Sequence, residues 1–259
     1  MLSNLFSIDR NQNALVDWWV SVREKRAFAQ VLKRLKAQFQ PDETFALQHQ
    51  ALIRQLREEG VVFLPKHLTL PAGMAETLKK QVETQGYFCD NVQTWYPRSF
   101  PEPLSAYLQN SFVRQIIAHA RGYDSPVNIS RFYLSETLNE VNGSFLWHHD
   151  ALFDYYKAMV YLTDVTDADG PFEYALGSHR KWWTYYSYQR SRFTDQQVSR
   201  FTCKRFTGQV GDLMIFNANG IHRAANPQWG RWRLVLSTAF IDFKSDESTD
   251  HAETQHLFR

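Results

Sequence analysis

The segment Trp147-His148-His149-Asp150 brings two imidazoles and a carboxylate within four residues. On a β-strand, residues two positions apart point to the same side, so His148 and Asp150 would aim together while His149 aims away. One imidazole and one carboxylate are two of the three ligands of a 2-His-1-carboxylate facial triad, which holds Fe(II) and leaves its other positions open. Taken alone, the pattern is weak evidence, because a surface turn or a hydrogen-bonded core histidine would also account for it.

A third possible ligand and a cation occur later in the chain. The segment 211–216 reads as a turn entering a strand and leads to His222, and Arg233 follows eleven residues further on at the start of an apolar run. The turn at 226–230 would fold the strand of Arg233 back beside that of His222. We therefore expect His148, Asp150 and His222 to bind the metal.

Arg233 is the expected partner of 2-oxoglutarate, a cosubstrate that chelates iron through its α-keto acid end. The far carboxylate of 2-oxoglutarate needs a cation, and the planar guanidinium can bind a carboxylate in a bidentate manner. A surface salt bridge is the alternative for Arg233 alone, and Arg231 is its nearest competitor for the role.

Further candidates are assigned less directly. His149 is expected to contact substrate or a metal ligand rather than the metal, and His179 to stabilise a turn. The aromatic and basic stretch 181–192 fits either a wall of the substrate pocket or an annex packed on helices. Strand residues near the site are candidate cosubstrate contacts, but a one-residue change of register would turn each to the opposite face. These are Tyr133, Lys157, Met159 and Tyr161.

Hydrophobic periodicity predicts the elements that position these residues. The spacing predicts helices over Leu15–Phe39, Asp42–Gly60, Ala72–Gln85 and Ser111–Arg121, with a buried strand at Val61–Leu64. Gly60 is expected just after the end of its helix, where a left-handed conformation is common.

The second half of the chain alternates short apolar runs with turn residues, a pattern typical of a β-sandwich or barrel. The predicted strands are Val127–Leu134, Phe145–Asp150, Lys157–Leu162, Phe172–Tyr174, Thr202–Phe206, Asp212–Phe216 and Arg233–Ile241. The helices would pack on one face of this core, which gives an α+β arrangement.

Composition excludes several classes of protein. The chain has 259 residues, of which 44% are hydrophobic, and a net charge of +2, so neither disorder nor a nucleic-acid or membrane footprint is indicated. Two cysteines, Cys89 and Cys203, are too few for a disulfide scaffold. We see no apolar run long enough for a membrane span and no signal peptide, so a cytoplasmic location is expected.

The order and spacing of several segments resemble the phytanoyl-CoA dioxygenase family. They are Leu56–Pro65, Trp147–Asp150, Lys157–Val165, Gly170–Phe172, Gly177–Arg180, and His222 with Arg233, and together they run from about residue 47 to residue 242. Two departures stand out: Leu176 where the family has proline, and Ala224 where some members have a serine that helps to hold 2-oxoglutarate.

The resemblance implies a double-stranded β-helix, or jelly-roll, core and dependence on Fe(II), 2-oxoglutarate and O2. The expected organisation is a single domain over 1–259, with a mainly helical part at 1–125, the core at 126–242 and a tail at 243–259. The expected activity is hydroxylation of an unactivated C–H bond in a small-molecule or carrier-linked substrate, with release of succinate and CO2. Asp150 argues against a halogenase of this type, whereas desaturation, cyclisation and epimerisation use the same triad.

Two other classes of function remain open from the sequence. The chain could be a non-catalytic jelly-roll protein that binds a ligand, or a zinc hydrolase, because a facial triad also suits zinc. Arg233 argues against the hydrolase, which does not need a residue that binds a cosubstrate carboxylate. The intact triad argues against the non-catalytic protein, whose metal site would be vestigial. The substrate and the oligomeric state are not assigned by the sequence.

Overall fold

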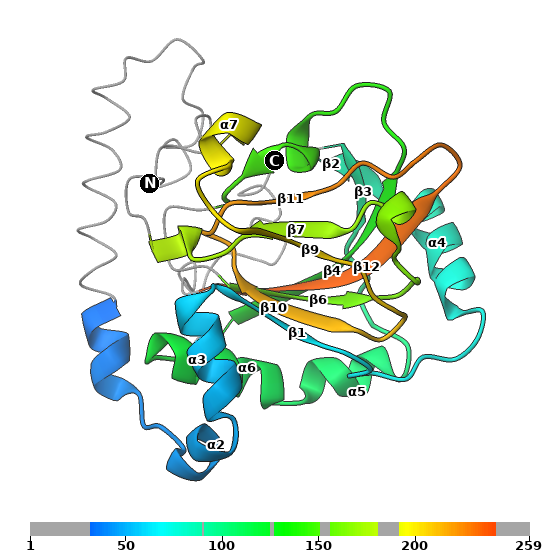
Figure 1. Cartoon of the computed structure of the whole chain (residues 1–259). Coiled ribbons are helices and arrows are strands. Elements are labelled where there is room, and N and C mark those ends of the chain that lie inside the picture. Colours follow the sequence, from blue (N-terminus) through cyan, green and yellow to red (C-terminus); the bar gives the residue numbers. More distant parts are fainter. Residues whose placement is uncertain (1–31, 90, 125–126, 151–155, 181–191, 242–259) are drawn as a thin grey trace, which may run out of the picture.

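The computed structural model describes residues 32–89, 91–124, 127–150, 156–180 and 192–241. Two antiparallel sheets face each other, and most of the helices lie against the outer face of the larger sheet (Figure 1). The larger sheet has the order β1-β10-β6-β12-β4-β3-β2, and the smaller has the order β8-β5-β11-β7-β9. This is the jelly-roll core with packed helices that the sequence predicts.

Strands of the larger sheet are β1 (Val61–Leu64), β2 (Tyr87–Cys89), β3 (Val92–Trp95), β4 (Val127–Glu136), β6 (Tyr156–Tyr161), β10 (Leu213–Asn217) and β12 (Trp232–Ile241). Strands of the smaller sheet are β5 (Trp147–His148), β7 (Phe172–Ala175), β8 (Arg192–Phe193), β9 (Cys203–Phe206) and β11 (His222–Ala224). The short strands β2, β3 and β8 were not predicted, because two to four residues give too short a pattern to separate from turns. A strand at His222 was expected and is present as β11, but it does not pair with the strand of Arg233, because β11 belongs to the smaller sheet and β12 to the larger.

The α-helices are α2 (Glu43–Gln48), α3 (Gln50–Glu58), α4 (Met74–Gln85), α5 (Leu104–Gln109), α6 (Phe112–Arg121) and α7 (Asp195–Val198). Residues 32–38 are also helical, and the rest of the helix predicted over Leu15–Phe39 lies outside the described residues, apart from 39. None of the helices in the described ranges combines the length and the apolar character of a membrane span.

The single helix predicted over Asp42–Gly60 is wrong, since it is divided at His49. This residue leaves the helical conformation, with φ −111° and ψ 20°, and its ring packs against Phe45 and Phe112. Gly60 follows the end of α3 with φ +86°, as expected. A Cβ at Gly60 would lie 2.4 Å from both the Tyr174 hydroxyl and the His179 Nδ1, so the close approach of α3 to the smaller sheet also requires glycine.

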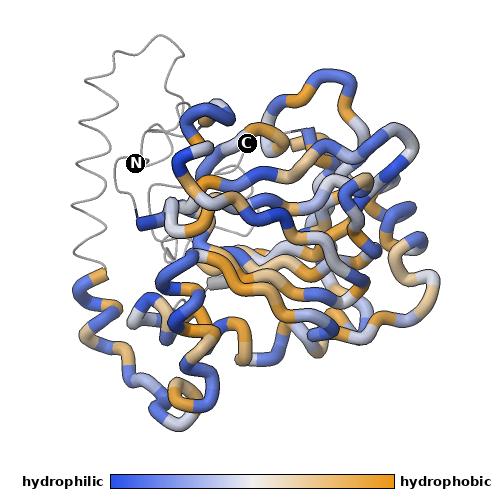
Figure 2. Tube along the Cα trace, viewed as in Figure 1, coloured by the Kyte–Doolittle hydropathy of each residue, from blue (hydrophilic) through white to orange (hydrophobic). Residues whose placement is uncertain are grey.

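Two apolar layers flank the larger sheet. One side packs Val160, Leu234 and Leu236 against helical residues such as Leu56 and Ile116. Apolar residues accordingly gather along β1 and β10 and on the helices beneath them (Figure 2).

The opposite side of the sheet faces the interior of the jelly roll. There, Tyr161 and Val235 pack with Phe172 and Tyr174 of the smaller sheet. Because side chains alternate along a strand, this packing assigns the described side chains of β4, β6 and β12 either to the helices or to the interior.

Candidate metal and cosubstrate site

His148 and His222 are directly opposite each other on the paired strands β5 and β11 of the smaller sheet. Their ring centroids are 4.4 Å apart. Asp150 lies two residues beyond the end of β5, and its backbone N–H donates to the carbonyl of Ala218 at 2.9 Å. The strand predicted over Phe145–Asp150 is thus too long: Gly143–Phe145 is a 3-10 turn, and β5 has two residues.

The three side chains nevertheless converge. The Nε2 atom of His148 lies 3.5 Å from one carboxylate oxygen of Asp150, and the Nε2 atom of His222 lies 3.6 Å from the other. One ligand atom from each residue can be chosen so that all three lie within 4.8 Å of one another. Two ligands about 2.1 Å from a metal and at right angles to each other would be about 3.0 Å apart, so a small contraction of this group would fit an ion.

Backbone carbonyls orient both imidazoles. The Nδ1 atom of His148 donates to the Leu146 carbonyl at 2.7 Å, and that of His222 donates to the Gly220 carbonyl at 2.8 Å. A carbonyl can only accept, so the hydrogen of each neutral ring is on Nδ1 and the lone pair is on Nε2. This is the arrangement found around metal-binding histidines, whose second nitrogen usually donates to a carbonyl or carboxylate.

Lys157 of β6 lies against Asp150, with its Nζ atom 2.6 Å from the second carboxylate oxygen. Burial alone would raise the pKa of the Asp150 carboxyl, but the charge of Lys157, together with the contacts of His222 and His148, holds the pKa well below its usual range. Asp150 is therefore an anion at neutral pH, which is the form that binds a cation.

His222 is buried among aromatic rings. The centroids of Phe216, Phe172 and Tyr174 lie 5.2, 5.6 and 6.3 Å from that of the imidazole. Burial, followed by the charge of His148, lowers the pKa of His222 to about 3, although Asp150 acts in the opposite direction. The imidazole is thus neutral at physiological pH, as a metal ligand must be.

Arg233 is 5% exposed and points into the interior from β12. Its guanidinium donates to the Gly170 carbonyl and, at 3.2 Å, to the Ser135 hydroxyl, while its Nε has no hydrogen-bond partner. Within the described ranges it forms no ion pair with a carboxylate. Burial lowers the pKa of Arg233, but an arginine remains charged. The competitor Arg231 has a side chain that is 61% exposed and faces Asp169 at 3.8 Å.

The sheet register places the other four candidate contacts, Tyr133, Lys157, Met159 and Tyr161, on the same interior face as Arg233. The Tyr161 hydroxyl donates to the Phe206 carbonyl at 2.7 Å and accepts from the Phe172 N–H at 3.3 Å. Tyr161 thus offers a ring rather than a free hydroxyl to the interior.

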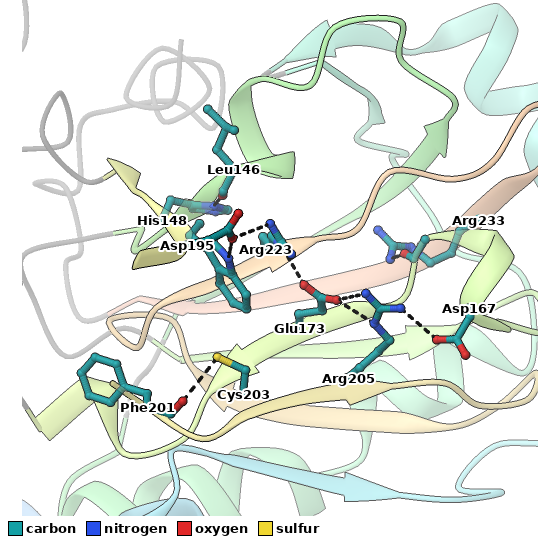
Figure 3. Close-up of polar contacts among 12 residues, drawn as sticks. Leu146, His148, Asp167, Glu173, Asp195, Phe201, Cys203, Arg205, Arg223 and Arg233 are labelled. Atoms are coloured by element: carbon teal, nitrogen blue, oxygen red, sulfur yellow. Dashed lines mark hydrogen bonds and ion pairs between the residues drawn. The ribbon is translucent and has the colours of Figure 1, made fainter. Parts of the chain in front are cut away.

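The outer face of the smaller sheet carries an ion-pair network centred on Glu173, which is 5% exposed. Its two oxygens each lie 2.5 Å from an arginine, Arg205 of β9 and Arg223 of β11 (Figure 3). Arg223 also lies over the ring of Trp147, 4.3 Å from its centroid. Arg223 is next to His222 in sequence, and Trp147 is next to His148. The network therefore connects β11 and β5 on the outer face of the smaller sheet, opposite the metal ligands.

The remaining candidates are not among the three residues that converge. His149 is buried on the outer side of the smaller sheet, 5.9 Å from the ring of Phe193. His179 contacts the carbonyl of Arg57 through Nε2 at 3.1 Å, next to the 2.8 Å bond between the N–H of Gly177 and the carbonyl of Glu59. It therefore fastens the turn after β7 to α3. The stretch 181–192 lies outside the described residues except for Arg192, on β8.

Sequence reasoning missed Arg131, which is 7% exposed on the interior face of β4. A signal was available, since Arg131 is two residues before the candidate Tyr133 and must share its face. The contact between Lys157 and Asp150 was also missed, because no sequence signal pairs a β6 residue with the segment after β5.

No family model and no curated protein sequence matches this chain. Solved structures of similar fold include SnoK, a non-heme alpha ketoglutarate dependent carbocyclase from nogalamycin biosynthesis. The TM-score is 0.57 at 18% identity, over 79% of this chain and 90% of that chain. The epimerase SnoN, in complex with Fe3+, alpha ketoglutarate and nogalamycin RO, has a TM-score of 0.58 at 15% identity, covering 79% and 93%.

A third similar structure is EctD from S. alaskensis with bound Fe, with a TM-score of 0.52 at 17% identity over 73% of this chain and 75% of that chain. At such identities the likeness shows the shared fold. It confirms the predicted jelly-roll core, whereas the resemblance to the phytanoyl-CoA dioxygenase family stays a prediction.

Proposed function

We propose that this protein is an Fe(II)- and 2-oxoglutarate-dependent oxygenase acting on a small-molecule substrate. The observation that carries the proposal is the convergence of His148, Asp150 and His222. Two imidazoles and one anionic carboxylate form the donor set that suits Fe(II) and leaves coordination positions open. The similar folds of SnoK, SnoN and EctD, all described with iron or alpha ketoglutarate, support the same class.

Arg233 distinguishes this proposal from a zinc hydrolase. Burying a guanidinium is costly unless an anion accompanies it, and within the described residues no carboxylate does so. The far carboxylate of 2-oxoglutarate would supply that anion. Tyr133, Lys157, Met159 and Tyr161 are proposed to line the cosubstrate beside Arg233.

The chain's own residues would bind and orient the reactants. His148, Asp150 and His222 would hold the metal, Arg233 would anchor the cosubstrate, and the rings around His222 would exclude water. When bound, iron, 2-oxoglutarate and O2 supply the oxidising chemistry, with succinate and CO2 as the co-products. Of the possible outcomes, we propose hydroxylation of an unactivated C–H bond, and membership of residues 1–259, as one domain, in the phytanoyl-CoA dioxygenase family.

The test is succinate release from 2-oxoglutarate by the Fe(II)-loaded protein, first alone and then with a substrate panel analysed by mass. Wild type should release succinate, and His222→Ala and Asp150→Ala should release none while remaining folded. A matched control is His179→Ala, which removes a histidine outside the triad and should retain release. Turnover at wild-type level in both soluble ligand variants would contradict the proposal, and absence of succinate with metal-dependent hydrolysis would favour the zinc enzyme.

A further inference from the structure

A second polar row crosses the interior face of the larger sheet. Arg131 of β4 is directly opposite Ser237 of β12, and Ser237 is directly opposite Met159 of β6. All three point into the jelly roll, because the neighbouring interior positions Tyr133 and Val235 pack there. The row is distinct from Arg233, which lies four residues from Ser237 on β12.

Arg131 is held by aromatic side chains. Its guanidinium donates to the Tyr96 hydroxyl, and its carbon lies 4.8 Å from the ring centroid of Tyr133 and 5.4 Å from that of Tyr96. Tyr87 stacks on Tyr96 with a centroid separation of 6.3 Å and is 39% exposed. A column of tyrosines thus runs from the surface to a guanidinium whose planar fork matches carboxylate and phosphate groups.

Ser237 gives an independent sign of a ligand. It is 1% exposed, and its hydroxyl has no hydrogen-bond partner within the described part of the chain. Buried hydroxyls in native proteins are nearly always hydrogen-bonded, so an oxygen from a bound molecule is the expected partner. Arg131, which faces Ser237 across one strand spacing, could bind the same group.

The position of this row relative to the metal ligands suits the primary substrate. Ser237 lies two residues, about 7 Å along the strand, from Ala239, and Ala239 is directly opposite Lys157, which contacts Asp150. A molecule held at Arg131 would therefore extend to the metal ligands. The interior positions of β4, β6 and β12 include three cations, Arg131, Lys157 and Arg233, and no carboxylate.

We propose that Arg131 and Ser237 form an anion subsite for the primary substrate, and that this substrate carries a carboxylate or phosphate group. The inference rests on the proposed function, in which Lys157 pairs with Asp150 and Arg233 binds the far carboxylate of 2-oxoglutarate. Arg131 and Ser237 are then the residues that select for negative charge at a position beside the reacting carbon.

The test uses the full-length protein loaded with Zn(II), which prevents turnover, and saturated with 2-oxoglutarate so that Arg233 is occupied. Benzoate and phenyl phosphate are titrated calorimetrically as probes, with benzamide and phenol as neutral counterparts. At least one anion should bind more tightly than its neutral counterpart, and the better of the two identifies the carboxylate or the phosphate as the preferred group.

The variants are Arg131→Gln, Arg131→Lys and Ser237→Ala, with Arg114→Gln as the control, since Arg114 forms a surface pair with Asp124. Arg131→Gln should weaken binding of the preferred anion at least tenfold, equivalent to about 1.4 kcal/mol. Arg131→Lys should weaken it less, and Arg114→Gln should not change it. If Arg131→Gln does not fold, the Arg131→Lys and Ser237→Ala titrations carry the test, with a measurable loss expected in both.

Three results would overturn the inference. The first is equal binding of anions and neutral counterparts by wild type, and the second is unchanged anion binding in every variant. The third is weaker 2-oxoglutarate binding in Arg131→Gln with no change in the binding of the probes. The last would place Arg131 in the cosubstrate site. Failure of the proposed function has a different signature, because wild type would then not bind 2-oxoglutarate at all. Anion binding that depends on Arg131 would still support the subsite in that case.

Discussion

Replacing Lys157 by methionine should destabilise the metal-free protein and increase the stabilisation that a metal provides. The Lys157 Nζ and Asp150 Oδ2 atoms are 2.6 Å apart, and the two side chains are 12% and 17% exposed. Removing one partner of a buried pair leaves an uncompensated charge and typically costs about 3–5 kcal/mol. Because this pair is not wholly buried, we expect about 3 kcal/mol in the metal-free state. Methionine preserves the apolar stem, so little packing is lost.

A bound divalent cation would replace Lys157 as the partner of Asp150, so most of this cost should disappear in the metal-loaded protein. By linkage, the metal should then stabilise Lys157→Met by about 3 kcal/mol more than wild type, equivalent to metal binding that is tighter by roughly a hundredfold. Removing the repulsion between Lys157 and the cation acts in the same direction.

The assay is urea unfolding of wild type and variant, each measured without metal and with saturating Zn(II). Lys79→Met is the matched control, because Lys79 lies on α4, 3.3 Å from the half-exposed Glu136. That change should cost less than about 1 kcal/mol and leave the metal increment unchanged. An equal metal increment in wild type and Lys157→Met would refute the coupling between Lys157 and the site.

Three further perturbations test other parts of the structure. Arg233→Ala should weaken 2-oxoglutarate binding in a titration by roughly 30-fold to several thousand-fold, because a desolvated charge pair loses one partner. The exposed Arg231→Ala should leave the binding unchanged. Weaker binding in Arg231→Ala and unchanged binding in Arg233→Ala would assign the carboxylate contact to Arg231. Glu173→Gln should lower the free energy of unfolding by about 1–2 kcal/mol in urea, since the buried carboxylate loses its charge beside two partly exposed arginines, and the exposed Asp167→Asn should have little effect. Gly220→Ala should weaken Zn(II) binding, because a Cβ would lie 1.8 Å from a tyrosine hydroxyl of β7 and displace the carbonyl that orients His222; unchanged Zn(II) affinity would show that this turn does not position the ligand.

The sequence predicted the long strands and the helices α4 and α6 well, because their apolar periodicity extends over enough residues. It did not predict the short helices α5 and α7. It could not divide α2 from α3, since the break at His49 depends on ring contacts with Phe45 and with Phe112, 63 residues further along the chain. It also extended β5 to Asp150, although the backbone there leaves the strand to bond Ala218.

For the candidate site, the local spacing of His148 and Asp150 and the later His222 were enough to name the three side chains that converge. The inward orientation of Lys157, Met159 and Tyr161 could not be assigned, because it depends on the register of β6 against β12. Ser237 was overlooked for the same reason, because only the pairing of β4 with β12 makes it a neighbour of Arg131. Arg131 itself could have been named from its spacing from Tyr133.

The place of β12 in the larger sheet has a consequence for synthesis on the ribosome. This strand is the last of the described strands in chain order, yet it lies between β6 and β4 in the middle of the sheet. Until it emerges, β6 and β4 each have an unpaired edge, a state that favours aggregation. The larger sheet is therefore completed late in synthesis. The metal site is also completed late, because His222 precedes β12 by only ten residues. A nascent chain that already displays His148 and Asp150 still lacks the third ligand, so premature capture of a metal ion during translation is disfavoured.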